Sequence, residues 1–275
     1  MTAWVALIDR LPFEWAHFAF MQHALLAVLL VSPLFALLGC LVISNQMAFF
    51  SEAVGHAALT GIAIGVVLGV ADPTWSMMAF AVLLALSVSF LRRRSSVSPD
   101  TLIGLVMACA VALGVVLLSR GGGFAKYSVF LIGDLLTITP AEIGRIALIL
   151  LVVVALWVGW FNRFLLTFLN RPLAHSRGVN VWAIEALFAG TVAVVVTASI
   201  PWVGLLVVNS LLIIPAATAR TLAVSTRQYV LFALILSEIA GVAGLVLSFH
   251  WGTATGATIV LVAMALYLAS LPLRR

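Results

Sequence analysis

The sequence predicts an all-α protein, a polytopic bundle of eight or nine transmembrane helices. Of the 275 residues, 64% are hydrophobic and only 8% are charged, whereas about a quarter of the residues in a soluble domain are charged. The mean hydropathy is +1.26. Successive apolar runs of about 17 to 25 residues are each long enough to cross a hydrocarbon core about 30 Å thick. The links between these runs are too short for a soluble domain, so we expect one membrane domain over residues 1–275.

Hydropathy and turn residues place the spans in order along the chain. The N-terminal segment 1–17 combines charged side chains with Trp4 and Trp15 and lacks the features of a signal peptide, so we expect an interfacial lead-in there. The predicted spans follow at 18–43, 53–71, 75–91, 101–119, 142–162, 181–200, 203–222, 229–249 and 254–271. Their number is nine, or eight if one short run only dips into the bilayer.

Basic residues gather in the links after the third, fifth and seventh spans and at the C-terminus. Alternation along the chain puts these four segments on one side of the membrane, and they carry ten of the fourteen basic residues. Because cytoplasmic links are enriched in Lys and Arg, that side is predicted to be cytoplasmic. The C-terminus is then cytoplasmic and the N-terminus extracytoplasmic. The net charge of +5 indicates orientation and not a nucleic-acid partner.

The link after the fourth span is the only long one on the external side. Its core, YSVFLIGDLLTI, is too apolar for a free loop, so we expect a surface or re-entrant helix within residues 120–140. Asp134 lies in this segment. Its carboxylate either guides a metal ion or simply begins a helix after a glycine.

The second span carries a regular pattern of small residues. Gly61, Gly65 and Gly69 recur at every fourth position, and such spacing lets helix backbones approach closely in lipid. This pattern predicts that the span over 53–71 is central in the bundle.

Several catalytic and energy-coupling motifs are absent. Lys126 is the only lysine, and the glycines before it do not have the spacing of a phosphate-binding loop. The sequence contains no HExxH, GxSxG or CxxC. We therefore expect a protein that is not an enzyme and that has no ATP-binding module of its own.

Ionisable residues inside the spans are candidates for function because burying a charge in a membrane is costly. Glu52 and His56 are four residues apart, which puts both side chains on one helix face. A carboxylate oxygen with an imidazole nitrogen suits a divalent ion such as Zn²⁺ or Mn²⁺. The alternative is structural, with Ser51 capping the helix, Glu52 favoured in its first turn and His56 bonded to Glu52.

Two further ionisable residues belong to the eighth span or its end. Glu238 must face the bundle interior or water, as a structural hydrogen-bond acceptor or as part of a transport pathway. His250, beside Trp251, is either an interfacial histidine or a metal ligand.

Five segments together resemble a known family, the membrane permeases of the zinc, manganese and iron ABC importers. The resemblance is collinear and leaves only the first residues uncovered. The segments are NQMAFFSEAVGHAALTGIAIG (45–65), FLIGDLLTIT (130–139), NRPLAHSRGVNVW (170–182), PWVGLLVVNSLLIIPAATARTLA (201–223) and SFHWGTATGATIVLVAMALYL (248–268).

The resemblance implies the permease of a type II ABC importer in the cell's inner (plasma) membrane. Two permease copies would form the path, separate cytoplasmic ATPase subunits would drive it, and an extracytoplasmic metal-binding protein would deliver zinc, manganese or iron as cargo rather than as a resident cofactor. Ser51, Glu52 and His56 match the family pattern S-D-A-x-x-H-A, with Glu52 in place of the usual aspartate.

The segment 168–182 resembles the cytoplasmic link that couples such permeases to their ATPase. The residues that match it are Asn170, Pro172, Leu173, Ala174, Arg177 and Gly178. The competing hypothesis is a secondary carrier or channel for cations that uses Glu52, His56 and Glu238 as a relay.

Overall fold

The computed structural model describes residues 4, 8–9, 12–70, 72–119 and 135–273. In these ranges nine helices are long and apolar enough to cross a membrane, and no strand occurs, as the sequence predicts. The long helices are α2 (Ala19–Ser44), α3 (Phe50–Val67), α4 (Pro73–Leu91), α5 (Pro99–Ser119), α7 (Pro140–Leu169), α9 (Val181–Val203), α10 (Leu205–Leu222), α11 (Thr226–Trp251) and α12 (Thr255–Ser270). The short elements are η1 (Glu14–His17), η2 (Leu135–Thr137), α8 (Arg171–Ser176) and η3 (Leu271–Leu273).

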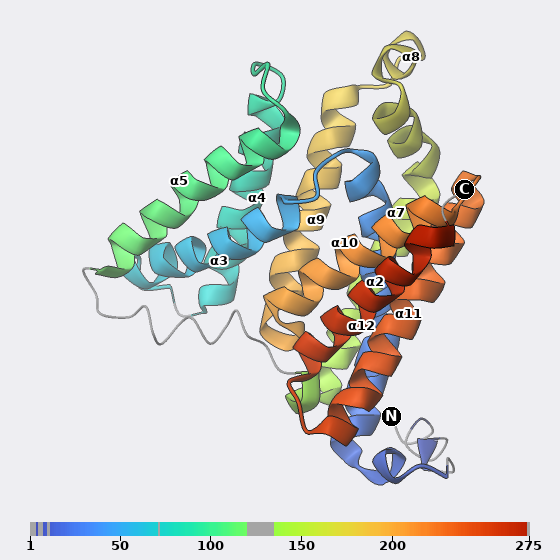
Figure 1. The fold of residues 1–275 in the computed structure, drawn as a ribbon. Coiled ribbons are helices and arrows are strands. Elements are labelled where there is room, and N and C mark those ends of the chain that lie inside the picture. Colours follow the sequence, from blue (N-terminus) through green and yellow to red (C-terminus); the bar gives the residue numbers. More distant parts are fainter. Residues whose placement is uncertain (1–3, 5–7, 10–11, 71, 120–134, 274–275) are drawn as a thin grey trace. The chain divides into compact units, whose positions relative to one another are not determined.

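Contacts divide the chain into two units, and Figure 1 shows the helices that each contains. Unit 1 holds Met1–Cys40, Gly133–Ala155 and Trp202–Arg275, and unit 2 holds Leu41–Ile132 and Leu156–Pro201. Most of the external segment expected at 120–140, including Asp134, lies outside the described residues.

Helix α3 is the centre of unit 2, where it packs against both α4 and α5. A Cβ atom on Gly61 would lie 2.7 Å from the Met77 Cα and 2.8 Å from the Ser76 carbonyl oxygen of α4. On the α5 side, the Thr60 hydroxyl donates to the Ala110 carbonyl at 2.6 Å. Small residues and one interhelical hydrogen bond thus let α3 lie close to two neighbours.

The glycines of the second span do not all act in packing. Gly65 approaches the Ser76 side chain of α4 so closely that a Cβ would clash. The expectation for Gly69 is wrong, because α3 ends at Val67 and, among the described residues apart from its chain neighbours, none has an atom within 4 Å of a Cβ on Gly69. Gly69 instead has a φ of 70°, the left-handed conformation that ends many helices and that glycine adopts without strain.

Unit 1 contains a second group of packed helices, α10, α11 and α12. A Cβ on Gly244 of α11 would lie 2.6 Å from the Ile259 Cα of α12. Helix α11 is also bonded to α2, because the Ser237 hydroxyl donates to the Ser32 carbonyl at 3.0 Å. The Tyr229 hydroxyl donates to the Cys40 carbonyl, also on α2, at 3.2 Å.

The N-terminal segment is tied to the start of unit 1. The Trp4 indole donates to the Gln22 carbonyl at 2.9 Å, and Trp15 in η1 is buried. These contacts attach the described part of the lead-in to the first turns of α2.

In each unit taken by itself, the basic links lie at one end. Figure 1 shows the α4–α5 connection and α8 at the same end of unit 2. In unit 1, the Thr221 and Ser270 hydroxyls are 3.2 Å apart, which places the end of α10 beside the end of α12. This arrangement agrees with the alternation inferred from the sequence.

Replacing Gly61 with leucine is expected to destabilise the protein by at least 2–3 kcal/mol, roughly the upper range for overpacking, because the new Cβ would meet the backbone of α4. Thermal unfolding in detergent measures this effect. Gly104→Ala on α5 is the control, since no other described helix has an atom within 4 Å of the added methyl group; it is expected to be neutral or stabilising by up to about 1 kcal/mol. Equal melting temperatures for the two variants would contradict the close approach of α3 and α4.

Candidate metal site and cytoplasmic link

Glu52 and His56 lie together at the beginning of α3. Glu52 belongs to the first helical turn, and its Oε1 is 3.9 Å from the His56 Nε2. The two side chains are 42% and 40% exposed, respectively. The separation is too long for a direct hydrogen bond, and it leaves room for an ion to be held between an oxygen and a nitrogen ligand.

The pair occupies the one open face of this part of α3. Between residues 50 and 63 only Glu52, His56 and Leu59 are partly exposed, and every other residue is buried. Their i, i+4 and i+7 spacing forms a narrow stripe along the helix. Two of the three side chains on this stripe can bind metal.

The structural alternative, in which Ser51 caps the helix, is wrong. The residue that caps α3 is Phe49, and it makes no side-chain capping bond. Ser51 lies inside the helix and is buried, and its hydroxyl has no hydrogen-bond partner in the described part of the chain. Glu52 is therefore not the second member of a Ser51 cap.

The remaining candidates do not join the pair within unit 2. Glu238 lies on α11 in unit 1, and its Oε2 is buried without a hydrogen-bond partner among the described residues. His250 is exposed near the end of α11, with its Nδ1 2.9 Å from the Val246 carbonyl oxygen of its own helix. Across the described residues, no three His, Cys, Asp or Glu side chains gather as a potential metal site.

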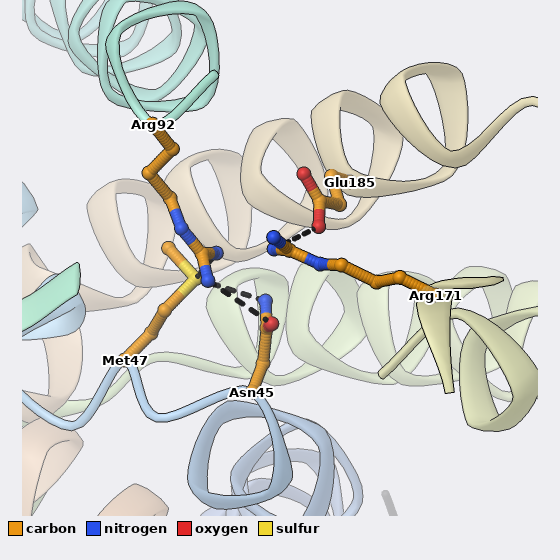
Figure 2. A network of polar contacts seen from close by, with 5 residues as sticks. All are labelled: Asn45, Met47, Arg92, Arg171 and Glu185. Carbon is orange, nitrogen blue, oxygen red and sulfur yellow. Dashed lines mark hydrogen bonds and ion pairs between the residues drawn. The ribbon is translucent and has the colours of Figure 1, made fainter. Parts of the chain in front are cut away.

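A polar cluster that the sequence did not reveal lies at the basic end of unit 2 (Figure 2). It consists of Asn45, Met47, Arg92, Arg171 and Glu185, and we call it the arginine cluster. The Arg171 Nη2 donates to the Glu185 Oε1 at 2.5 Å, which joins α8 to α9. The Arg92 guanidinium donates to the Met47 Sδ at 3.1 Å and to the Asn45 Oδ1 at 3.4 Å.

The arginine cluster contains a buried charged side chain. Glu185 is only 5% exposed. Burial lowers the pKa of the Arg92 guanidinium, and the nearby Glu185 carboxylate opposes that shift. One buried carboxylate thus attracts two arginines from different links, one after α4 and one at the start of α8. The signal in the sequence was an acidic residue in the first turns of a span that directly follows a basic link.

Helix α8 is short, and local interactions at both of its ends define it. The Asn170 Oδ1 accepts the Leu173 N–H at 3.0 Å, and Pro172 occupies the first turn, the combination typical of a helix start. Gly178 ends the turn with a φ of 71°. Leu173 is 42% exposed and Arg177 is also exposed.

Ala174 is the one buried residue of α8. Its side chain is 0% exposed, so it packs inside the chain and does not offer a contact to a partner. Every other residue of α8 is exposed, and so is Arg177, which follows it.

These features define a polytopic, all-helical membrane protein with a two-residue candidate metal site and a capped helical link. A search with family models matches residues 17–274 to the ABC 3 transport family. The chain belongs to this family.

Relatives of this chain include named transport proteins. The high-affinity zinc uptake system membrane protein ZnuB of Haemophilus influenzae is 31% identical over 258 residues, which cover 92% of this chain and 97% of the relative. The manganese transport system membrane protein MntC of Listeria monocytogenes is 28% identical over 254 residues, which cover 91% and 89%.

A solved structure has the same fold. The structure of PsaBC from Streptococcus pneumoniae in complex with Fab aligns with a TM-score of 0.77 and 25% sequence identity, and the match covers 98% of this chain and 95% of that chain.

Proposed function

We propose that this chain is the permease subunit of an ATP-driven importer of divalent transition metal ions, with zinc or manganese as cargo. The observation that carries the proposal is the Glu52–His56 pair on the open stripe of α3. An oxygen and a nitrogen ligand in one turn suit Zn²⁺ or Mn²⁺. Membership of the ABC 3 transport family supports an ABC importer over a secondary carrier.

The pair supplies two ligands, and a homodimer would supply four. A two-fold axis presents the same surface of both copies to one another. If the α3 stripe faces that axis, two carboxylates and two imidazoles surround the path, the number of protein ligands that a tetrahedral zinc site uses. Glu52 carries its charge about one bond farther from the backbone than an aspartate would, which adapts the size of this site.

The orientation follows from the basic links. In each unit, the end that carries the basic links faces the cytoplasm of a cell whose inner membrane holds the protein, with the C-terminus inside and the N-terminus outside. The link between α5 and α7 then belongs to the external side of the membrane. An extracytoplasmic metal-binding protein delivers the ion there.

ATP hydrolysis takes place on a separate cytoplasmic subunit. The coupling segment 168–182 contacts this ATPase through the outer face of α8, where Leu173 and Arg177 are exposed. Asn170, Pro172 and Gly178 set the shape of this segment.

Uptake into vesicles tests the proposal. With the purified ATPase subunit and the metal-binding protein present, we expect accumulation of ⁶⁵Zn²⁺ or ⁵⁴Mn²⁺ that requires MgATP. Accumulation by the chain alone, driven by a proton gradient or a voltage and indifferent to ATP, would contradict the importer and support a secondary carrier.

The same vesicles test the coupling segment. Leu173→Asp places a charge on the exposed outer face of α8 and is expected to lower both ATPase binding and ATP-driven uptake at least tenfold. His175→Gln, also on α8, is the control and is expected to leave ATPase binding unchanged. If ATPase binding survives Leu173→Asp, the ATPase docks elsewhere while the importer proposal stands.

A further inference from the structure

A large cavity opens at the basic end of unit 2, next to the arginine cluster. Its volume is about 1050 Å³, and it is formed by the end of α4, by α8 and by the start of α9. The residues that line it are Arg92, Arg93, Arg171, Pro172, His175, Gly178, Val179, Asn180, Val181, Trp182 and Glu185.

The lining has a strong positive charge. Three arginines face the cavity, together with one acidic residue. That acid, Glu185, is buried and already bonded to Arg171 at 2.5 Å. Arg93 is exposed, and the Arg171 side chain is 49% exposed. The cavity therefore presents guanidinium donors that match the geometry of a phosphate group.

The cavity adjoins the ends of two candidate membrane spans, the level at which lipid headgroups are expected. It adjoins the last residues of the span α4 and the first residues of the span α9. Trp182, which lines it, is 43% exposed, and tryptophan is enriched at membrane–water interfaces.

An apolar track on α4 leads from the membrane to this cavity. Leu83, Leu86 and Phe90 are 59%, 42% and 49% exposed. Their spacing i, i+3 and i+7 places them on one side of α4, which ends at Leu91, and Arg93 lies in the turn that follows. An acyl chain along these three residues would end beside that turn.

Helix α8 presents different residues to the cavity and to its outer surface. Arg171, Pro172 and His175 of α8 line the cavity, together with Gly178 just beyond its end. Leu173 and Arg177 lie outside this lining and remain available to a protein partner. The cavity and the proposed ATPase contact are therefore separate surfaces.

We propose that this cavity binds the headgroup of an anionic phospholipid from the leaflet at the α8 end of the bundle. The phosphate pairs with Arg93 and with the outward part of Arg171, and an acyl chain follows the α4 track. Basic pockets between transmembrane helices are typical sites for acidic headgroups. The apolar track favours a lipid over an acidic protein segment, which needs no such path.

Native mass spectrometry of the purified permease, without the ATPase, tests this proposal. Palmitoyl-oleoyl phosphatidylglycerol is added to the detergent-solubilised protein, with phosphatidylcholine of the same chains as the comparison. We expect selective retention of phosphatidylglycerol. Arg93→Gln is expected to weaken this retention about fivefold, the effect of one interfacial cation, and Arg93→Lys is expected to preserve most of it.

Arg227→Gln is the matched control. It removes the same charge from an exposed arginine at the start of α11, which lies outside the cavity lining and off the α4 track. Retention should match that of the unmodified protein. Equal retention by all variants, or equal retention of both lipids, would overturn the site.

Two other results identify a different occupant and also overturn the lipid. One is Arg93-dependent binding of inorganic phosphate with no selectivity for phosphatidylglycerol. The other is unchanged lipid retention in Arg93→Gln combined with loss of ATPase copurification, which assigns the cavity to an acidic surface of the partner.

Discussion

His56→Ala is expected to lower ATP-driven metal uptake by at least about 100-fold while the permease still folds and binds its ATPase. Groups that only orient a metal ligand already affect metal affinity by about 10–100-fold, and His56 is proposed to contact the ion itself. The side chain is 40% exposed, so its removal leaves little empty space in the core. Isotope uptake into vesicles and copurification of the ATPase measure the two outcomes separately.

Leu59→Ala provides the control for this prediction, because Leu59 lies on the same stripe of α3 and cannot bind metal. Its uptake should stay within a few-fold of the unmodified protein. Glu52→Gln should match His56→Ala, whereas Glu52→Asp should retain uptake because it keeps the carboxylate. If His56→Ala and Leu59→Ala have equal effects, the stripe acts through packing and the metal role is wrong.

Arg171→Met is expected to destabilise the protein by about 2–3 kcal/mol, because it leaves the buried Glu185 carboxylate without its main partner. Breaking a fully buried ion pair costs about 3–5 kcal/mol. The effect here should be smaller, since the Arg171 side chain is 49% exposed and Arg92 still attracts Glu185. Thermal unfolding of the detergent-solubilised protein measures the loss.

The double variant Arg171→Met with Glu185→Leu distinguishes the contribution of the ion pair to stability from the contribution of the surrounding packing. Removing both charges should recover at least half of the lost stability, because no uncompensated carboxylate remains buried. Arg177→Met, a change of the same type at an exposed position, should leave the melting temperature unchanged. A double variant no more stable than Arg171→Met would show that the ion pair does not account for the loss.

The membrane fold could be predicted from the sequence because its main cause is local. A span must supply enough consecutive apolar residues to cross the hydrocarbon core, and this property is visible without any knowledge of tertiary contacts. The helical spacing of Glu52 and His56 was visible for the same reason. The ends of the helices were less predictable. Helix α3 ends at Val67, so Gly69 belongs to the turn after the helix and does not lie on its packing face.

The arginine cluster could not be predicted because its members are far apart in the sequence. In the sequence, Arg92 belongs to a basic link and Glu185 to the start of a later span, and no pattern pairs them. Their meeting depends on the packing of α4, α8 and α9, which single-sequence patterns do not specify. Ala174 illustrates the same limit, since its burial follows from the neighbours of α8 and not from its own segment.

The caps of α8 have a consequence for how fast and how tightly a partner binds. Asn170 at the start and Gly178 at the end hold this turn through bonds within the segment itself. The loop therefore does not have to order when a partner arrives, and association avoids much of the conformational entropy that a flexible loop loses. If the proposed ATPase contacts α8, a turn held in this way would pass the movement of that subunit to α9, because little of the movement would be absorbed by bending.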